Sequence, residues 1–169
     1  MLAAAALLAA TAARAPAQWG LFDSEFDEQK KPWSEIEARL PAYPKADQLI
    51  RFEAGAASPH RFYIDPASLS VGEDGVVRYT LVVKTAGGAT NVSFEGIRCA
   101  SREQKLYALG QSDGKWLRAR EPAWRHIEYK ELNRHYGVLY ADFFCPDRRK
   151  PGSVKEIVEA LRREDARLR

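Results

Sequence analysis

Residues 74–99 read DGVVRYTLVVKTAGGATNVSFEGIRC, and this stretch decides the fold class because it predicts a β-hairpin. The pair Asp74-Gly75 is typical of a tight turn that opens a strand. The strand that follows alternates, and its apolar residues share one face: Val77, Tyr79, Leu81 and Val83. The pair Gly87-Gly88 then turns the chain back into a second strand.

The register of this hairpin follows from the position of its turn. A turn centred between Gly87 and Gly88 predicts three cross-strand pairs: Val83 with Val92, Leu81 with Phe94, and Tyr79 with Gly96. Past Phe94 the alternation slips by one residue, so that Ile97 and Cys99 become the apolar set. We therefore expect a β-bulge at Glu95-Gly96, where glycine permits it.

The polar face of the hairpin is the candidate binding surface. In the predicted register Arg78, Glu95 and Arg98 lie close together there, beside Thr80 and Ser93. One interpretation is a solvated face with a cross-strand ion pair of little net worth. The other is a recognition patch, because arginine is enriched among residues that dominate binding.

The N-terminus predicts export. Residues 1–17, MLAAAALLAATAARAPA, combine an apolar run too short to span a bilayer with small residues at Ala15 and Ala17, so we expect a signal peptide cut after Ala17 and a periplasmic protein. No Lys or Arg precedes the apolar run, which leaves an atypical signal, a start upstream of Met1, or a buried Ala-rich helix as alternatives. Residues 18–32 form an acidic and aromatic leader, either flexible or a short docking segment. Residues 33–169 form a single domain.

The net charge limits the classes of partner, and the two cysteines bear on the redox state of the compartment. The formal net charge is +3, and removal of Arg14 with the signal leaves +2, which is too little to indicate nucleic acid or an anionic membrane as partner. Cys99 and Cys145 are the two cysteines, and an oxidising compartment favours a disulfide between them. Closing a loop of about 47 residues stabilises the fold by roughly 4 kcal/mol at most.

The rest of the chain completes an α+β prediction: a mostly antiparallel sheet of roughly five or six strands, with helices from the C-terminal third packed on one face. Short strands are expected at 50–53, 61–64 and 104–109, with a turn at Asp65-Pro66 and a further short strand at Leu69 and Val71. Two helical turns are expected at 33–40, with Ser34 as the cap.

The C-terminal third favours helices. Apolar residues recur at helical spacing from Leu132 to Phe143, although Gly137 leaves a strand at 138–144 as the alternative. Ser153 and Glu156 form a capping box before a final amphipathic helix.

No pattern indicates catalysis. His60, His126 and His135 lack metal-ligand spacing, and no serine elbow or phosphate loop is present, so we expect no catalytic, metal or cofactor site. A carboxylate pair formed only in space remains the alternative, which would make the protein a hydrolase of cell-envelope material.

Distinctive segments are spread over almost all of the chain after the signal: Phe26-Asp27-Glu28, Trp33-Ser34-Glu35, LPAYP at 40–44, DGVVRYTLVV at 74–83, NVSFEGIRC at 91–99, Leu106-Tyr107-Ala108, Trp116, Trp124 and Phe144-Cys145. In these the chain resembles the cryptic neisserial protein-like family of exported proteobacterial proteins. The resemblance implies an exported single-domain protein and carries over no functional residues. We therefore expect a non-catalytic envelope domain that binds a protein or cell-wall partner, without a membrane span after export and with no prediction of oligomeric state.

Overall fold

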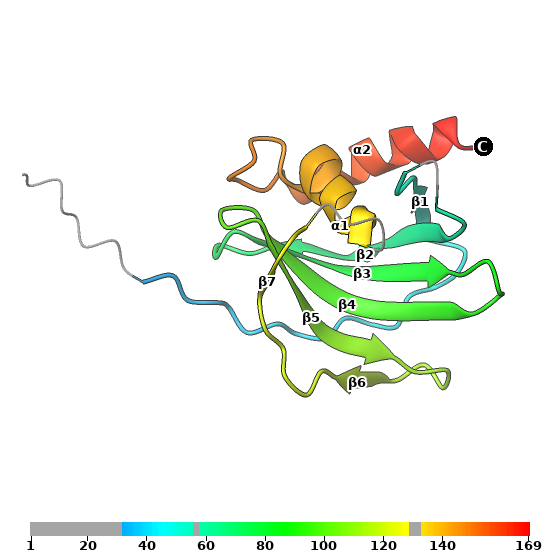
Figure 1. The fold of residues 1–169 in the computed structure, drawn as a ribbon, viewed down its shortest axis with the longest axis horizontal. Helices are drawn as coiled ribbons and strands as arrows, with labels where there is room; N and C mark the ends of the chain where they lie inside the picture. The colour runs from blue at the N-terminus through cyan, green and yellow to red at the C-terminus, as the bar shows by residue number, and fades with distance from the viewer. Residues whose placement is uncertain (1–31, 56–57, 129–132) are drawn as a thin grey trace, which may run out of the picture. The chain divides into compact units, whose positions relative to one another are not determined.

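The β-rich middle of the chain folds as an antiparallel meander in the computed structural model, which describes residues 32–55, 58–128 and 133–169. Within these residues the sheet has seven strands in the order β1-β2-β3-β4-β5-β6, and β7 also pairs with β5 (Figure 1). In chain order the strands are β1 Ile50–Phe52, β2 Arg61–Val71, β3 Val76–Lys84, β4 Thr90–Arg98, β5 Glu103–Gly110, β6 Trp116–Arg118 and β7 Arg125–His126. The predicted antiparallel α+β fold is confirmed.

The β2–β3 connection has the predicted tight turn. Gly75 has φ +74°, a left-handed conformation that suits glycine, and its N–H donates to the carbonyl of Gly72. The predicted turn at Asp65-Pro66 lies inside one long strand, β2, as an irregularity between Asp65 and Ser70. There the hydroxyl of Ser68 accepts a hydrogen bond from the N–H of Thr80, in place of a backbone carbonyl.

The β3–β4 hairpin forms, but its predicted register is wrong by one residue. The N–H of Thr85 donates to the carbonyl of Ala89, and the N–H of Gly88, at φ +87°, donates to the carbonyl of Thr85. The loop therefore has three residues, 86–88, with glycine in the left-handed position, rather than two. As a result Val82, and not Val83, pairs with Val92.

A shift of one residue sends each side chain of β4 to the opposite face. Phe94 pairs with Thr80 and Glu95 pairs with Tyr79, so the alternation along β4 is unbroken and the bulge predicted in β4 is wrong. The irregularity lies in β5, where Phe94 pairs with Ala108 and Glu95 pairs with Leu106, leaving Tyr107 as the extra residue. At Gly96, a Cβ atom would lie 2.7 Å from the Tyr107 hydroxyl, so glycine leaves room for that ring.

Helices cover one face of the sheet, as predicted. They are α1 Arg134–Val138, the π-helix η2 Leu139–Phe144 and α2 Val154–Arg167. The helical interpretation of the segment after residue 132 is thus confirmed from residue 134 onward, and the strand alternative is wrong. Ser153 and Glu156 form the predicted capping box, and α2 buries Ile157 and Leu161. No helix in the described part of the chain is long and apolar enough to cross a membrane.

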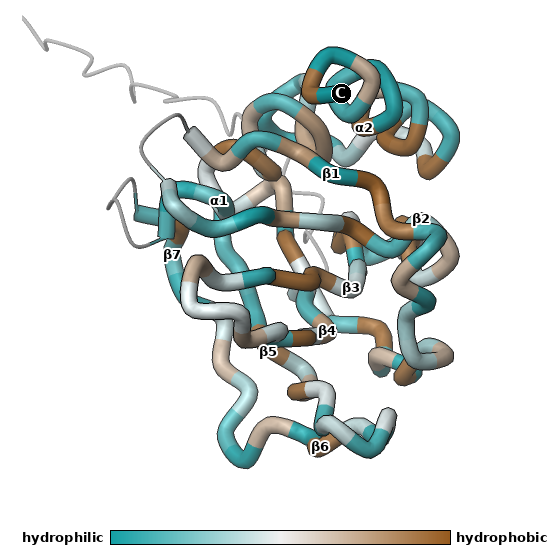
Figure 2. The backbone as a smooth tube through the Cα atoms, turned by 90° about the vertical axis from the view of Figure 1, so that its right-hand side faces the viewer, coloured by the Kyte–Doolittle hydropathy of each residue, from teal (hydrophilic) through white to brown (hydrophobic). Residues whose placement is uncertain are grey.

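The disulfide between Cys99 and Cys145 is present, as predicted. It joins the residue after β4 to the residue after η2, with a Cα–Cα distance of 5.6 Å. Both cysteines are fully buried in the core between the sheet and the helices. In Figure 2 hydrophobic residues are frequent in β2, β3 and β4, which contribute most of the strand residues of that core.

The predicted helix at 33–40 is wrong, because residues 32–45 adopt neither helix nor strand. Residues 33–43, which we call the strap, run in an extended course over the sheet face opposite the helices (Figure 1). The strap helps to bury a second apolar cluster of Ala38, Phe94, Tyr107 and Ala108. The middle of the sheet is therefore covered on both faces, which explains why β4 carries apolar residues in both phases of its alternation.

Candidate binding surface

Arg78, Glu95 and Arg98 do not form the shared surface that the sequence predicts. In the observed register Arg78 and Arg98 lie on the strap face, whereas Glu95 pairs with Tyr79 and faces the helices. Arg78 and Glu95 are also buried, with 5% and 3% of their surface exposed. The expectation of one exposed patch is wrong because it depended on the incorrect register.

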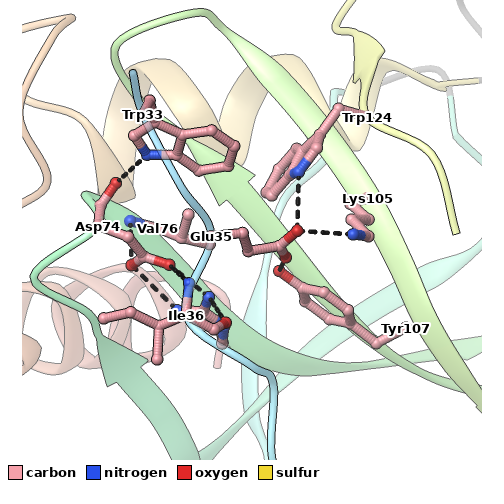
Figure 3. A network of polar contacts seen from close by, with 9 residues as sticks. Trp33, Glu35, Ile36, Asp74, Val76, Lys105, Tyr107 and Trp124 are labelled. Atoms are coloured by element: carbon pink, nitrogen blue, oxygen red, sulfur yellow. Dashed lines mark hydrogen bonds and ion pairs between the residues drawn. The ribbon is translucent and has the colours of Figure 1, made fainter. Parts of the chain in front are cut away.

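Arg78 is part of a polar network that holds the strap, and Figure 3 labels its partners Asp74 and Ile36. Its guanidinium donates to both carboxylate oxygens of Asp74, at 2.6 and 3.2 Å, and to the carbonyl of Ile36 at 2.7 Å. Asp74 also accepts from the N–H of Ile36, and the Trp33 indole donates to the Asp74 carbonyl. Burial opposes ionisation of Asp74, but the hydrogen bonds from Arg78 and from backbone amides outweigh it and lower the pKa of Asp74.

Glu35 forms a second anchor of the strap, also visible in Figure 3. Its carboxylate accepts hydrogen bonds from the Lys105 ammonium at 2.7 Å, the Tyr107 hydroxyl at 2.7 Å and the Trp124 indole at 3.1 Å. Burial works against ionisation, but these three donors and the charge of Lys105 lower the pKa of Glu35. The bulge at Tyr107 in β5 thus places its hydroxyl on a strap carboxylate.

Arg98 completes the strap face. Its guanidinium lies 3.7 Å from the ring centroid of Trp33, and it forms an ion pair of 3.9 Å with Glu103. Trp33 in turn meets Trp124 edge to face. Arg78, Lys105 and Arg98 on this face are therefore all engaged with the strap.

Glu95 lies on the helix face among hydroxyl groups. Its carboxylate accepts from Ser93 at 2.6 Å, Tyr79 at 2.9 Å and Tyr136 at 3.4 Å, and within the described residues it has no ion-pair partner. Burial raises the pKa of Glu95 more than the three hydroxyl donors lower it. Burial likewise raises the pKa of Tyr136, which reaches Glu95 from α1.

A hollow of about 300 Å³ lies beside Tyr136. Leu106 and Gln104 of β5 line it, together with the segment between β6 and β7 and the start of α1. Four polar side chains there form no hydrogen bond or ion pair in the described part of the structure: Gln104, Glu121, Arg125 and Asn133. These four side chains are thus free to meet a ligand, unlike the polar side chains that hold the strap.

Two exposed leucines continue this surface. Leu109 of β5 and Leu117 of β6 are directly opposed in the antiparallel pair and are 46% and 54% exposed. Leu109 also pairs with Ser93, so both leucines project from the helix face, where the helices leave them uncovered. We call the surface made by Leu106, Leu109, Leu117, Ala119 and Tyr136 the open face.

None of the three histidines lines the hollow, although the ring centroid of His135 lies 4.0 Å from that of Tyr136. His60 accepts from the N–H of Ala86, and His126 is exposed in β7 opposite Glu103. His135 stacks on Phe62, and burial lowers its pKa to about 4. Within the described residues no group of three or more His, Cys, Asp or Glu is placed to hold a metal ion.

Sequence reasoning missed the open face, although a signal was present. The turn at Asp113-Gly114 makes a hairpin in which Leu109 and Leu117 oppose each other. Both lie on the same face of the sheet as Ser93 of β4. Two apolar residues opposed in a short hairpin at the end of a sheet are a signal for an exposed apolar pair.

Comparison with known proteins gives a family and no closer relative. No curated protein sequence and no solved structure matches the chain. The CNP1-like family matches residues 28–162, a range that includes the strap, the sheet, the disulfide and most of α2. The more specific likeness to cryptic neisserial proteins stays a prediction, but the extent of this match is sufficient to show that the chain belongs to the CNP1-like family.

Proposed function

We propose that this protein is exported to the periplasm, with a cut after Ala17, and acts there as a non-catalytic domain that binds an envelope partner through the open face. Support for export comes from the Ala-rich residues 1–17, which lie outside the described residues, and a disulfide is compatible with an oxidising compartment.

The observation that carries the binding proposal is the exposure of Leu109 and Leu117 side by side on a sheet face that is otherwise buried. Adjacent exposed aliphatic side chains mark interaction surfaces more often than isolated ones. The hollow with its free polar groups adjoins them through Leu106 and Ala119, so apolar and polar recognition elements lie together. The partner that fits this surface is a protein or cell-wall peptide with both kinds of group.

The test is photocrosslinking in the intact envelope. A photoreactive amino acid at position 117 is expected to give a reproducible crosslinked partner, identified by mass spectrometry. The matched control is position 154, where Val154 is 36% exposed on α2, away from the open face. Equal products from both positions, or none from position 117, contradict the proposal. Edman sequencing of the exported protein is expected to begin at Gln18.

A second candidate function, hydrolysis of envelope material, is favoured by Glu95 alone. Burial raises the pKa of this carboxyl, the direction that favours a general acid. The side chain is only 3% exposed and Tyr136 covers it, so a substrate must displace Tyr136. Release of soluble fragments from isolated cell wall by the wild type, lost in Glu95→Gln, would support hydrolysis over simple binding.

A further inference from the structure

Side chains of opposite charge line the hollow beside Tyr136. Glu121 lines it from the segment between β6 and β7, Arg125 lines it from β7, and neither forms an ion pair with a described residue. The amide side chains of Gln104 and Asn133 line it from β5 and from the start of α1, also without partners. Leu106 and Ala123 add apolar surface.

We propose that this hollow binds a short zwitterionic peptide of two or so residues, an assignment that rests on the open face being a binding surface. Arg125 pairs with the peptide carboxylate and Glu121 with the ammonium group. Gln104 and Asn133 each offer a donor and an acceptor to the peptide group, and Leu106 and Ala123 contact a small aliphatic side chain.

The size of the hollow agrees with such a ligand. Its volume of about 300 Å³ lies at the lower end of the range for small-molecule sites. A dipeptide with small side chains is of this size, whereas a folded partner enters only through a chain end.

The charge pattern also separates this site from the polar groups under the strap. Glu35 meets Lys105, and Asp74 meets Arg78, so those carboxylates are neutralised by the fold. Glu121 and Arg125 are exposed and unpaired, although they lie four positions apart in the chain and line the same hollow. A ligand that carries both charges is complementary to both groups.

The experiment is an NMR titration of the full-length protein with three probes: alanyl-alanine, its N-acetylated form and its C-terminal amide. Shift changes at Gln104, Leu106 and Asn133 are expected with alanyl-alanine. Each blocked probe is expected to bind about two- to fivefold more weakly, because each loses one partly exposed charge contact.

Variants assign each charge to its residue. Glu121→Gln is expected to remove the preference for the free ammonium while retaining the preference for the carboxylate, and Arg125→Gln is expected to do the reverse. Glu73→Gln and Arg162→Gln, exposed and remote from the hollow, serve as matched controls and should preserve both preferences.

Equal binding of all three probes, or shift changes away from the hollow, would overturn the peptide assignment. In that case a crosslinked partner from position 117 would leave the proposed binding function intact. Failure of the crosslinking, with charge-dependent dipeptide binding retained, would instead contradict the envelope partner and leave the hollow as a peptide site.

Discussion

Polar side chains have different roles on the two faces of the sheet. Under the strap, Arg78 and Lys105 meet Asp74 and Glu35, and these contacts fasten an extended segment that has no regular hydrogen-bonding pattern of its own. Beside the open face, four polar side chains of the hollow have no partners in the described structure. Polar residues therefore provide stability on one face and remain available for binding on the other.

The largest expected effect comes from breaking the strap anchor. Arg78→Ala removes the ion-pair partner of Asp74 and the donor to the Ile36 carbonyl, in a pair whose side chains are only 7% and 1% exposed. Removing one partner of a buried ion pair destabilises a protein by about 3–5 kcal/mol. Urea denaturation measures this loss, and Arg125→Ala in the hollow, expected within about 0.5 kcal/mol of wild type, is the control. Similar losses in both variants would refute the difference between the faces.

The helix face depends on a covalent link that the strap lacks. Replacing Cys99 and Cys145 by alanine is expected to lower the free energy of unfolding by about 2–4 kcal/mol, because the link constrains the unfolded chain. Thermal denaturation of the double variant, compared with reduced and oxidised wild type, measures the effect. Wild-type stability that is unchanged by reduction contradicts it.

A smaller effect is expected at Glu35, with a defined pH dependence. Glu35→Gln weakens three hydrogen bonds to a carboxylate and is expected to cost about 1.5–3 kcal/mol at pH 7. Because the folded pKa of Glu35 is lowered, its contribution is present above the unfolded value of 4.5 and is lost as pH falls through the folded pKa. Denaturation at pH 7 and pH 3 should show the gap between wild type and variant closing at the lower pH.

Glu95 should respond in the opposite direction, with the smallest change of the four. Its folded pKa is raised, so its contribution to stability is fully present below 4.5 and is lost as pH rises through the folded pKa. Glu95→Gln is therefore expected to gain stability relative to wild type between pH 4 and pH 8. A relative loss over that range in denaturation midpoints would show that the ionised carboxylate stabilises the fold.

Features specified by local sequence could be predicted. Asp74-Gly75 and the Ser153–Glu156 capping box involve residues within four positions, and both occur as expected. The turn at Gly87-Gly88 was ambiguous, because two adjacent glycines permit either a two- or a three-residue loop. The sequence contains no local feature that decides between them, and the choice determines the face of every residue in β4.

The predictions for residues 33–40 and for the candidate surface were wrong because of contacts and pairings outside those segments. Residues 33–40 have reasonable helix propensity, but Asp74 and Arg78 bind the backbone of Ile36 and tertiary contacts override that propensity. The prediction that Arg78, Glu95 and Arg98 lie together was wrong because it used the wrong register of the β3–β4 hairpin. The open face depends on where the helices end over the sheet, which no short sequence window contains.

The short outer strands also affect whether copies of the chain can aggregate through the edges of their sheets. The outer edge of β5 is divided between β6 and β7, which pair with its two ends, and the N–H of Ala119 binds the carbonyl of Tyr107 between them. At the ends of the strand order lie β1 and β6, each three residues long. In the described part of the chain the sheet thus presents no long free edge for another β-strand, which protects it against edge-to-edge aggregation while Leu117 stays exposed beside that edge.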